Sequence, residues 1–196
     1  MAFIGMRHVV AAKIATETPG AALTYSAGMV VGKAIQGNLT WDRNDNPLYA
    51  DDAIAENDNG ATGGSIELVT DDLLDTVRAY LLGDEAISVG TGTSATTEYE
   101  STDEPAPYVG FGYIVGEITG GVKSYKGYWF PKVQFGMDND SATTKGESTE
   151  FQTNKLTGEI LGVQTTASGS VEYYYTDTDT TEAAVRTWLN GKAGIS

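Results

Sequence analysis

Alternation of apolar and polar side chains, which is typical of β-strands, runs through most of the chain. It is clearest at residues 106–119, where one face holds Val109, Phe111, Tyr113 and Val115. The opposite face holds Gly110, Gly112, Ile114 and Gly116. A strand face made mostly of glycine lets another element approach the backbone closely. We therefore expect an element to pack tightly against that side of the strand.

A second strand is expected to return alongside the first. A hairpin turn is predicted at Gly120-Gly121, and residues 126–135 follow as the returning strand. The side chains expected on one of its faces are Trp129, Val133 and Phe135. Pro131 cannot donate a ladder hydrogen bond, so it predicts a sheet edge or a β-bulge at that point.

Shorter alternating runs predict the remaining strands. They lie at 7–14, 29–41, 65–69, 150–163 and 170–176. The run 29–41 is either one strand or a pair of strands broken at Gly37-Asn38, and the run 150–163 is one strand or two joined at Gly158. In the last run, Val171, Tyr173 and Tyr175 are expected on one face.

Helical periodicity is strong in one place only. Residues 70–82 predict a helix capped by Thr or Asp at its start and ended by Gly83. The side chains expected to pack it on the sheet are Leu73, Leu74, Val77 and Leu81. A second, short helix is predicted at about 181–189.

Long polar segments separate these elements. Those at about 41–60 and 84–105 are expected to be exposed loops, the first with a short extended piece at 47–50, and residues 137–149 form a further loop. The element order predicts a mainly β fold, an antiparallel β-sandwich or partial barrel with one flanking α-helix. Residues 1–196 are expected to form a single domain.

Charge and composition narrow the function. Asp and Glu number 27 against 12 Lys and Arg, giving a net charge of −15. Such a surface repels phosphates and anionic membranes, so sequence-reading DNA binding is not expected. The chain has no cysteine, which excludes disulfides and thiolate sites. Its N-terminus has no basic segment followed by an apolar one, so we expect no signal peptide, and no apolar run is long enough to span a membrane.

Nucleotide and catalytic motifs fail on spacing. The segment Gly28–Ala34 has three residues between its glycines where a phosphate loop needs four. The glycines of 110–116 lie inside a strand and miss the dinucleotide pattern. His8 is the only histidine and is expected to be a strand residue with a satisfied imidazole. Adjacent carboxylates are plentiful, but nothing selects a pair for hydrolysis. We expect no catalytic residue, no cofactor and no enzyme activity.

A calcium loop is suggested only in part. Asp42, Asn44 and Asn46 match its first ligand positions, but Pro47 replaces the required glycine and Ala53 stands where the bidentate glutamate belongs. An EF-hand is excluded. A solvated acidic loop is the expectation, with an adventitious calcium site in 42–58 as the alternative.

Several short stretches, in order along the chain, carry a family resemblance. They are Ile4–Ala11, Gly32–Ile35, Leu48–Asp52 with Ala55-Glu56, Asp72–Leu74 with Leu82-Gly83, Tyr108–Tyr113, Tyr128–Phe135, and Phe151–Thr153 with Thr157-Gly158. Taken together, the chain resembles the major tail (tail tube) protein of long-tailed, non-contractile phages. Many members carry a C-terminal immunoglobulin-like domain, and for this chain we expect none.

The resemblance implies a tail-tube fold whose copies assemble in rings. Six copies would form each ring, and stacked rings would form the virion conduit through which viral DNA passes without specific binding. The implied partners are further copies of the chain and the tail terminator, tape measure and distal tail proteins. The subunit would be made in the host bacterial cytoplasm, and no membrane is involved.

Two sets of residues are the candidate sites of assembly. The proposed inter-ring contact loop comprises Trp41, Asp42, Asn46, Leu48, Tyr49, Asp51 and Asp52. The candidates for the sheet that faces the lumen are Phe111, Tyr113, Trp129 and Val133.

Three other readings stay open. One is a β-sandwich that binds carbohydrate or acts as an adhesin, which the tyrosines, tryptophans and acidic loops also fit. A second is a tube protein of a related secretion or pyocin system. The third is a hydrolase that uses two carboxylates, for which no site is evident.

Overall fold

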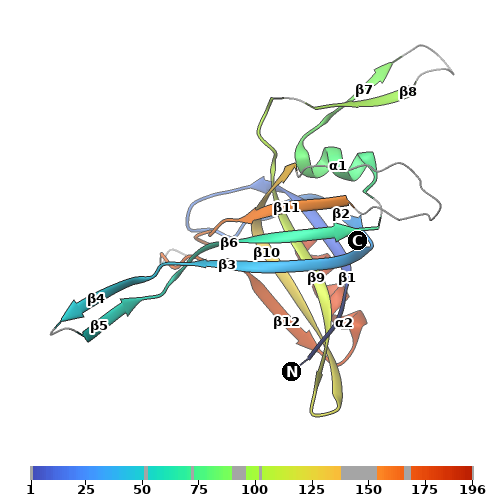
Figure 1. Ribbon diagram of the computed structural model, residues 1–196. Coiled ribbons are helices and arrows are strands. Elements are labelled where there is room, and N and C mark those ends of the chain that lie inside the picture. The colour runs from blue at the N-terminus through green and yellow to red at the C-terminus, as the bar shows by residue number, and fades with distance from the viewer. Residues whose placement is uncertain are drawn as a thin grey trace, which may run out of the picture.

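The fold is seen in a computed structural model (Figure 1). It describes residues 2–50, 53–71, 73–89, 96–101, 103–137, 154–165 and 169–195, with the backbone alone in β4 and β5. The elements are β1 (Ala2–Thr16), β2 (Thr24–Gly32), β3 (Ala34–Arg43), β4 (Asn46–Ala50), β5 (Ala53–Asp58), β6 (Ala61–Thr70), α1 (Asp75–Leu82), β7 (Glu85–Val89), β8 (Thr96–Glu100), β9 (Tyr108–Thr119), β10 (Val122–Met137), β11 (Asn154–Ile160), β12 (Tyr175–Asp179) and α2 (Glu182–Ala193).

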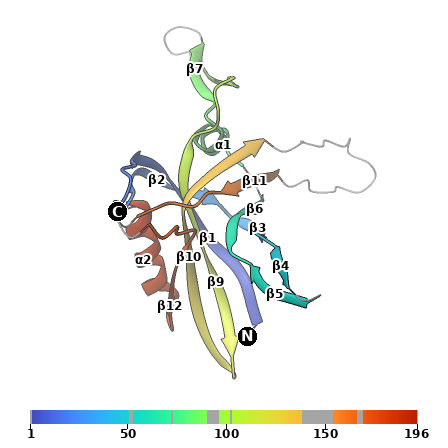
Figure 2. The same cartoon turned by 90° about the vertical axis from the view of Figure 1, so that its left-hand side faces the viewer.

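One antiparallel sheet forms the body. Its strand order is β2-β1-β9-β10-β11-β6-β3, and β12 pairs with the part of β10 that β11 leaves free. The sheet curls so that β3, at one edge, comes back against β1, where Met6 lies beside Gly37. Figure 2 shows the resulting layers, with β1, β9 and β10 between α2 on one side and β3, β6 and β11 on the other. The predicted mainly β, antiparallel sandwich with a flanking helix is confirmed.

The interior of the curled sheet holds the main core. Its fully buried members come from both layers and from α1: Val9, Phe111, Phe130, Val133, Phe135, Ile66, Leu68, Ile160 and Leu81. Aromatic rings meet within it, and the centroids of Phe111 and Phe135 lie 5.2 Å apart. Burial of such side chains contributes roughly 1.5–3 kcal/mol each to folding.

The glycine-rich face of β9 is covered by α2, which confirms the expected close packing. A second core lies there, made of Val10, Ala12, Ile114, Trp129, Val185, Leu189 and Ala193. A β-carbon on Gly127 of β10 would lie 2.8 Å from Cγ1 of Val185, so the helix rests directly on the strand backbone.

A bulge in β10 corrects one predicted face. The register against β9 shifts between Phe130 and Val133, around Pro131, as the proline predicted. The extra residue turns Trp129 towards α2, while Val133 and Phe135 point into the main core. The expectation that all three share one face was wrong because the bulge changes the alternation.

The first helix is shorter than predicted. It begins at Asp75 with Leu74 at the N-cap position and no side-chain cap, because Thr70 still belongs to β6, where it pairs with Asn154. Val77 and Leu81 are buried and Leu73 packs at the core edge, as expected. Leu74 is 59% exposed and does not pack on the sheet. Gly83, at φ 86°, ends the helix as predicted.

Other strand boundaries also differ from those predicted from the sequence. The run 29–41 is two strands, but Lys33 separates them rather than Gly37-Asn38. Strand β12 starts only at Tyr175, and before it a single bridge joins Glu172 to Val163. Of the run 150–163, β11 occupies 154–160.

The two segments expected to be loops contain hairpins. β4 pairs with β5, and β7 pairs with β8, each in a two-stranded sheet of its own. Among the described residues each hairpin pairs only with itself, and its mostly polar sequence resembles that of a loop. The extended piece at 47–50 is part of β4. The loop predicted at 137–149 lies outside the described residues, apart from its first.

Candidate assembly surfaces

The hairpin β4–β5 forms an arm that leaves the body (Figure 1). It continues the pair β3–β6, and at its base the backbone N–H of Asn44 donates to the carbonyl of Gly60 at 2.9 Å. From there β4 pairs with β5 alone, from Asn46 opposite Asp58 to Ala50 opposite Ala53. Among the described residues the two strands of this arm pair only with each other.

The residues predicted for inter-ring contact divide between body and arm. Asn46, Leu48 and Tyr49 lie in β4, and Asp42 is exposed at the end of β3. Asp51 and Asp52 lie outside the described residues.

Trp41 belongs to the body rather than to the arm. Its ring centroid lies 6.4 Å from that of Phe130, 6.3 Å from Tyr173 and 5.3 Å from Tyr174. Tyr173 in turn donates from its hydroxyl to the carbonyl of Ala61 at 3.1 Å. This aromatic group anchors the base of the arm to the curled sheet.

The four predicted lumen residues are core residues. Phe111, Tyr113 and Val133 lie in the main core, and Trp129 lies under α2. Both faces of β9 and β10 are covered at these residues, because the curled sheet closes over one and α2 over the other. None of the four side chains is exposed in the isolated chain.

Exposed apolar side chains gather instead at the tip of the β9–β10 hairpin. Phe3 (64% exposed) and Val122 (65% exposed) lie on one face of the projecting strands, and Ile4 and Ile118 lie on the other. We call these four residues the tip patch. Sequence analysis missed this patch. A strand segment that projects beyond the core has the same alternation of apolar and polar residues as a segment that covers the core.

A buried carboxylate lies behind the tip patch. Glu117 is paired in register with Phe3 on β1 and Ser124 on β10, and its side chain is buried. Its Oε1 has no hydrogen-bond partner among the described residues. A buried polar atom without a partner costs stability.

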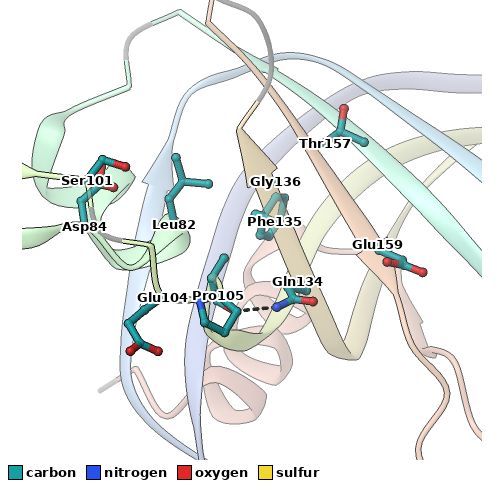
Figure 3. Close-up of a pocket in the computed structure, with 11 residues that line it drawn as sticks. Leu82, Asp84, Ser101, Glu104, Pro105, Gln134, Phe135, Gly136, Thr157 and Glu159 are labelled. Atoms are coloured by element: carbon teal, nitrogen blue, oxygen red, sulfur yellow. Dashed lines mark hydrogen bonds between the residues drawn. The ribbon is translucent and has the colours of Figure 1, made fainter.

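A cavity of about 510 Å³ opens at the other end of the same hairpin (Figure 3). Its walls come from the end of α1, the segment that leads into β9, the end of β10 and strand β11. The apolar lining includes Leu82, Pro105, Ala106 and Phe135, and the acidic lining is Asp84, Glu104 and Glu159. Gln134 donates from Nε2 to the carbonyl of Ala106 at 2.7 Å and holds the leading segment in place. We call this cavity the acidic pocket.

A second cavity, of about 360 Å³, lies beside the end of α2. The aromatic side chains that line it contact other groups of the protein. Tyr25 donates to the carbonyl of Pro131 at 2.9 Å, and Trp129 is buried edge-on to the Tyr25 ring. The Lys192 ammonium lies 4.7 Å from the centre of the Tyr175 ring. Each of these rings therefore has a contact within the protein at this cavity.

Hydroxyl groups hold a carboxylate next to that cavity. Hydrogen bonds from Thr165 (2.5 Å) and Tyr175 keep the pKa of Glu172 below its ordinary value of 4.5. Burial, with the neighbouring carboxylate, raises the pKa of the Tyr175 hydroxyl, which therefore stays a donor. The hydrogen bond from Tyr175 connects Glu172 to the start of β12, so we assign these bonds a structural role.

His8 is engaged as expected. Its Nε2 lies 2.7 Å from Oδ1 of Asn190 in α2, so the imidazole of this strand residue is satisfied. Within the described ranges, no three His, Asp or Glu side chains come together in a way that could hold a metal ion. No helix in the described part of the chain has the length and apolar content to cross a membrane.

No protein-family model matches the sequence, and no curated protein is significantly similar to it.

Proposed function

We propose that this chain is the structural subunit of a phage tail tube, which assembles into stacked rings of six copies. The observation that carries the proposal is the β4–β5 arm, a self-paired hairpin that projects from a well-packed body. The tip patch adds exposed apolar surface at another end of the molecule. Both features suit a protein whose surfaces are completed by copies of itself, and the sequence resemblance to tail tube proteins points the same way.

Open sheet edges support ring formation. Strands β2 and β3 end the strand order of the main sheet, and a strand at a sheet edge can pair with a strand of another chain. Val30 on β2 and Ile35 on β3 are exposed large apolar residues at these edges. A ring that brings edges of neighbouring copies together would pair these strands and remove the aggregation hazard of a free edge.

The negative charge of the chain supports a channel through which DNA passes without being bound. The net charge of −15 is multiplied sixfold in a ring. Carboxylates that face the channel would repel phosphates, so DNA would slide and not adhere. Replacing exposed acids that face the channel by lysine is expected to slow DNA delivery, and unchanged delivery would count against this part of the proposal.

The location and partners of the chain follow from its proposed role in a tail tube. The chain would act without catalysis or cofactor, in the tail of the virion. It would contact the tail terminator, tape measure and distal tail proteins, and these partners also separate a phage tail from a related secretion or pyocin tube.

The test is light scattering with negative-stain electron microscopy of the purified chain at low and high concentration. We expect rings or hollow tubes as the concentration rises. A chain that stays monomeric at high concentration and binds a glycan in a screen would contradict the proposal and identify a carbohydrate-binding module.

A further inference from the structure

The turn of the β9–β10 hairpin and helix α1, whose end borders the acidic pocket, lie at opposite ends of that hairpin (Figures 1 and 2). The hairpin β9–β10 joins the tip patch to the pocket: its turn is at one end, and Gln134, Phe135 and Gly136 of β10 form a wall of the pocket at the other. β9 has 12 residues, so the two ends are separated by roughly 40 Å. A contact between such ends is head-to-tail and can repeat from copy to copy along one axis.

The tip is narrow, apolar and basic. At Gly120 and Gly121, which have positive φ, a β-carbon would meet no atom within 4 Å. Val122 follows with most of its side chain in solvent. Lys123 is exposed, and its ammonium lies 5.2 Å from the centre of the Tyr125 ring, close to the turn. The hairpin therefore offers one apolar side chain and one cation on a thin support.

The pocket has the complementary chemistry. Glu104 and Glu159 are exposed at its rim, and Asp84 is bound by Arg78 at 3.4 Å. Leu82, Pro105 and Phe135 line it with apolar atoms. No lysine or arginine is among the described residues that line it. A volume of about 510 Å³ is in the range that accommodates small ligands, so it can take one or two side chains.

Charge also restricts where copies can meet. A chain with 12 bases and 27 acids repels itself at most orientations. A stable contact between copies must bring some of the scarce cations against the excess acids and bury apolar surface as well. The tip and the pocket meet both requirements.

We propose that the β9–β10 tip of one copy inserts into the acidic pocket of a second copy. Lys123 would lie between the carboxylates of Glu104 and Glu159, and Val122 would pack on Pro105. This inference rests on the proposed tube function, to which it adds a specific axial contact between rings, besides the β4–β5 arm.

Charge reversal tests the contact. Lys123→Glu and Glu104→Lys should each raise the concentration needed for assembly by about tenfold or more, whereas the double variant should recover assembly. Lys126→Glu is the matched control, because it makes the same change of charge on the same strand away from the turn and should leave assembly near that of the wild type. Circular dichroism confirms that each variant is folded. Equal effects of Lys123→Glu and Lys126→Glu, or no recovery in the double variant, would overturn the contact.

Cross-linking tests this contact independently of tube formation. The chain has no cysteine, so the variant with Val122→Cys and Pro105→Cys can form disulfides only through the new residues. Head-to-tail contact predicts a ladder of covalent multimers after mild oxidation, while each single variant gives dimers at most.

The outcomes are distinct. Tubes without a ladder would overturn the contact and leave the tube. A ladder without tubes would support the contact and contradict the tube. A chain that stays monomeric in both assays would contradict both.

Discussion

A β-carbon added to Gly112 of β9 would lie 2.6 Å from Cδ1 of Leu189 in α2. The same added carbon would lie 2.6 Å from the carbonyl oxygen of Tyr128 on the neighbouring strand. A side chain end can move aside, but a backbone oxygen in a sheet ladder cannot do so at low cost. The packing of α2 on β9 therefore depends on the absence of a side chain at Gly112.

We expect Gly112→Ala to lower the free energy of unfolding by about 1–3 kcal/mol, through overpacking of α2 against β9. The matched control is Gly191→Ala in α2, where a β-carbon would meet nothing within 4 Å. It should raise stability by up to about 1 kcal/mol, since alanine favours a helix over glycine. Chemical denaturation measures both. Equal effects of the two substitutions would show that α2 does not rest on β9 as described.

The buried carboxylate behind the tip patch gives a second prediction. Glu117→Leu removes a buried polar atom that has no partner among the described residues and fills the site with apolar atoms. We expect the free energy of unfolding to rise by about 1 kcal/mol. Glu98→Leu, at an exposed position of β8, should change it little. A large loss of stability in Glu117→Leu would mean that the carboxylate is satisfied in solution.

Acid should weaken the link between Glu172 and β12. The pKa of Glu172 is lowered in the folded protein by the Thr165 and Tyr175 hydroxyls. Its contribution is therefore complete above the ordinary value of 4.5 and is lost as the pH falls through the depressed folded pKa. Glu172→Gln should destabilise the chain by about 1 kcal/mol at pH 7, a modest effect because the site is half-buried.

The pH dependence supplies the check on that contribution. The difference between wild type and Glu172→Gln should shrink as unfolding is measured at successively lower pH. A difference that is constant from pH 7 to pH 3 would contradict the assignment.

Removal of the arm should separate folding from assembly. A variant in which residues 46–58 are replaced by a short glycine linker loses only strands that pair with each other. We expect its thermal unfolding to match the wild type and its ring stacking to fail in electron microscopy. The control is a variant that keeps the arm and shortens the turn between β7 and β8, which should still stack. Normal tubes from the armless variant would contradict the role given to β4–β5.

Sequence analysis predicted the parts of the fold in which local pattern and tertiary packing agree. The glycines of 106–119 predicted the close approach of another element, which is α2 in the structure, and the alternation of that run placed Phe111 and Tyr113 on one face. It failed where a local irregularity changes the pattern. The bulge at Pro131 was foreseen, but its effect on the direction of Trp129 was not.

The candidate site was less predictable. The strands of the arm pair only with each other among the described residues and have a polar sequence, so periodicity did not distinguish them from a loop. The tip patch and the acidic pocket depend on where the core ends along β9 and β10, and only the curled sheet determines that. Leu74 fits a helical stripe in sequence, yet the helix starts one residue later and leaves it exposed.

The most direct test of the central claim is electron cryo-microscopy of the assemblies formed by the wild-type chain at high concentration. The account predicts end-on views with sixfold symmetry around an open channel, and side views with a regular axial repeat of rings. Solid filaments, or sheets joined edge to edge without a channel, would contradict it.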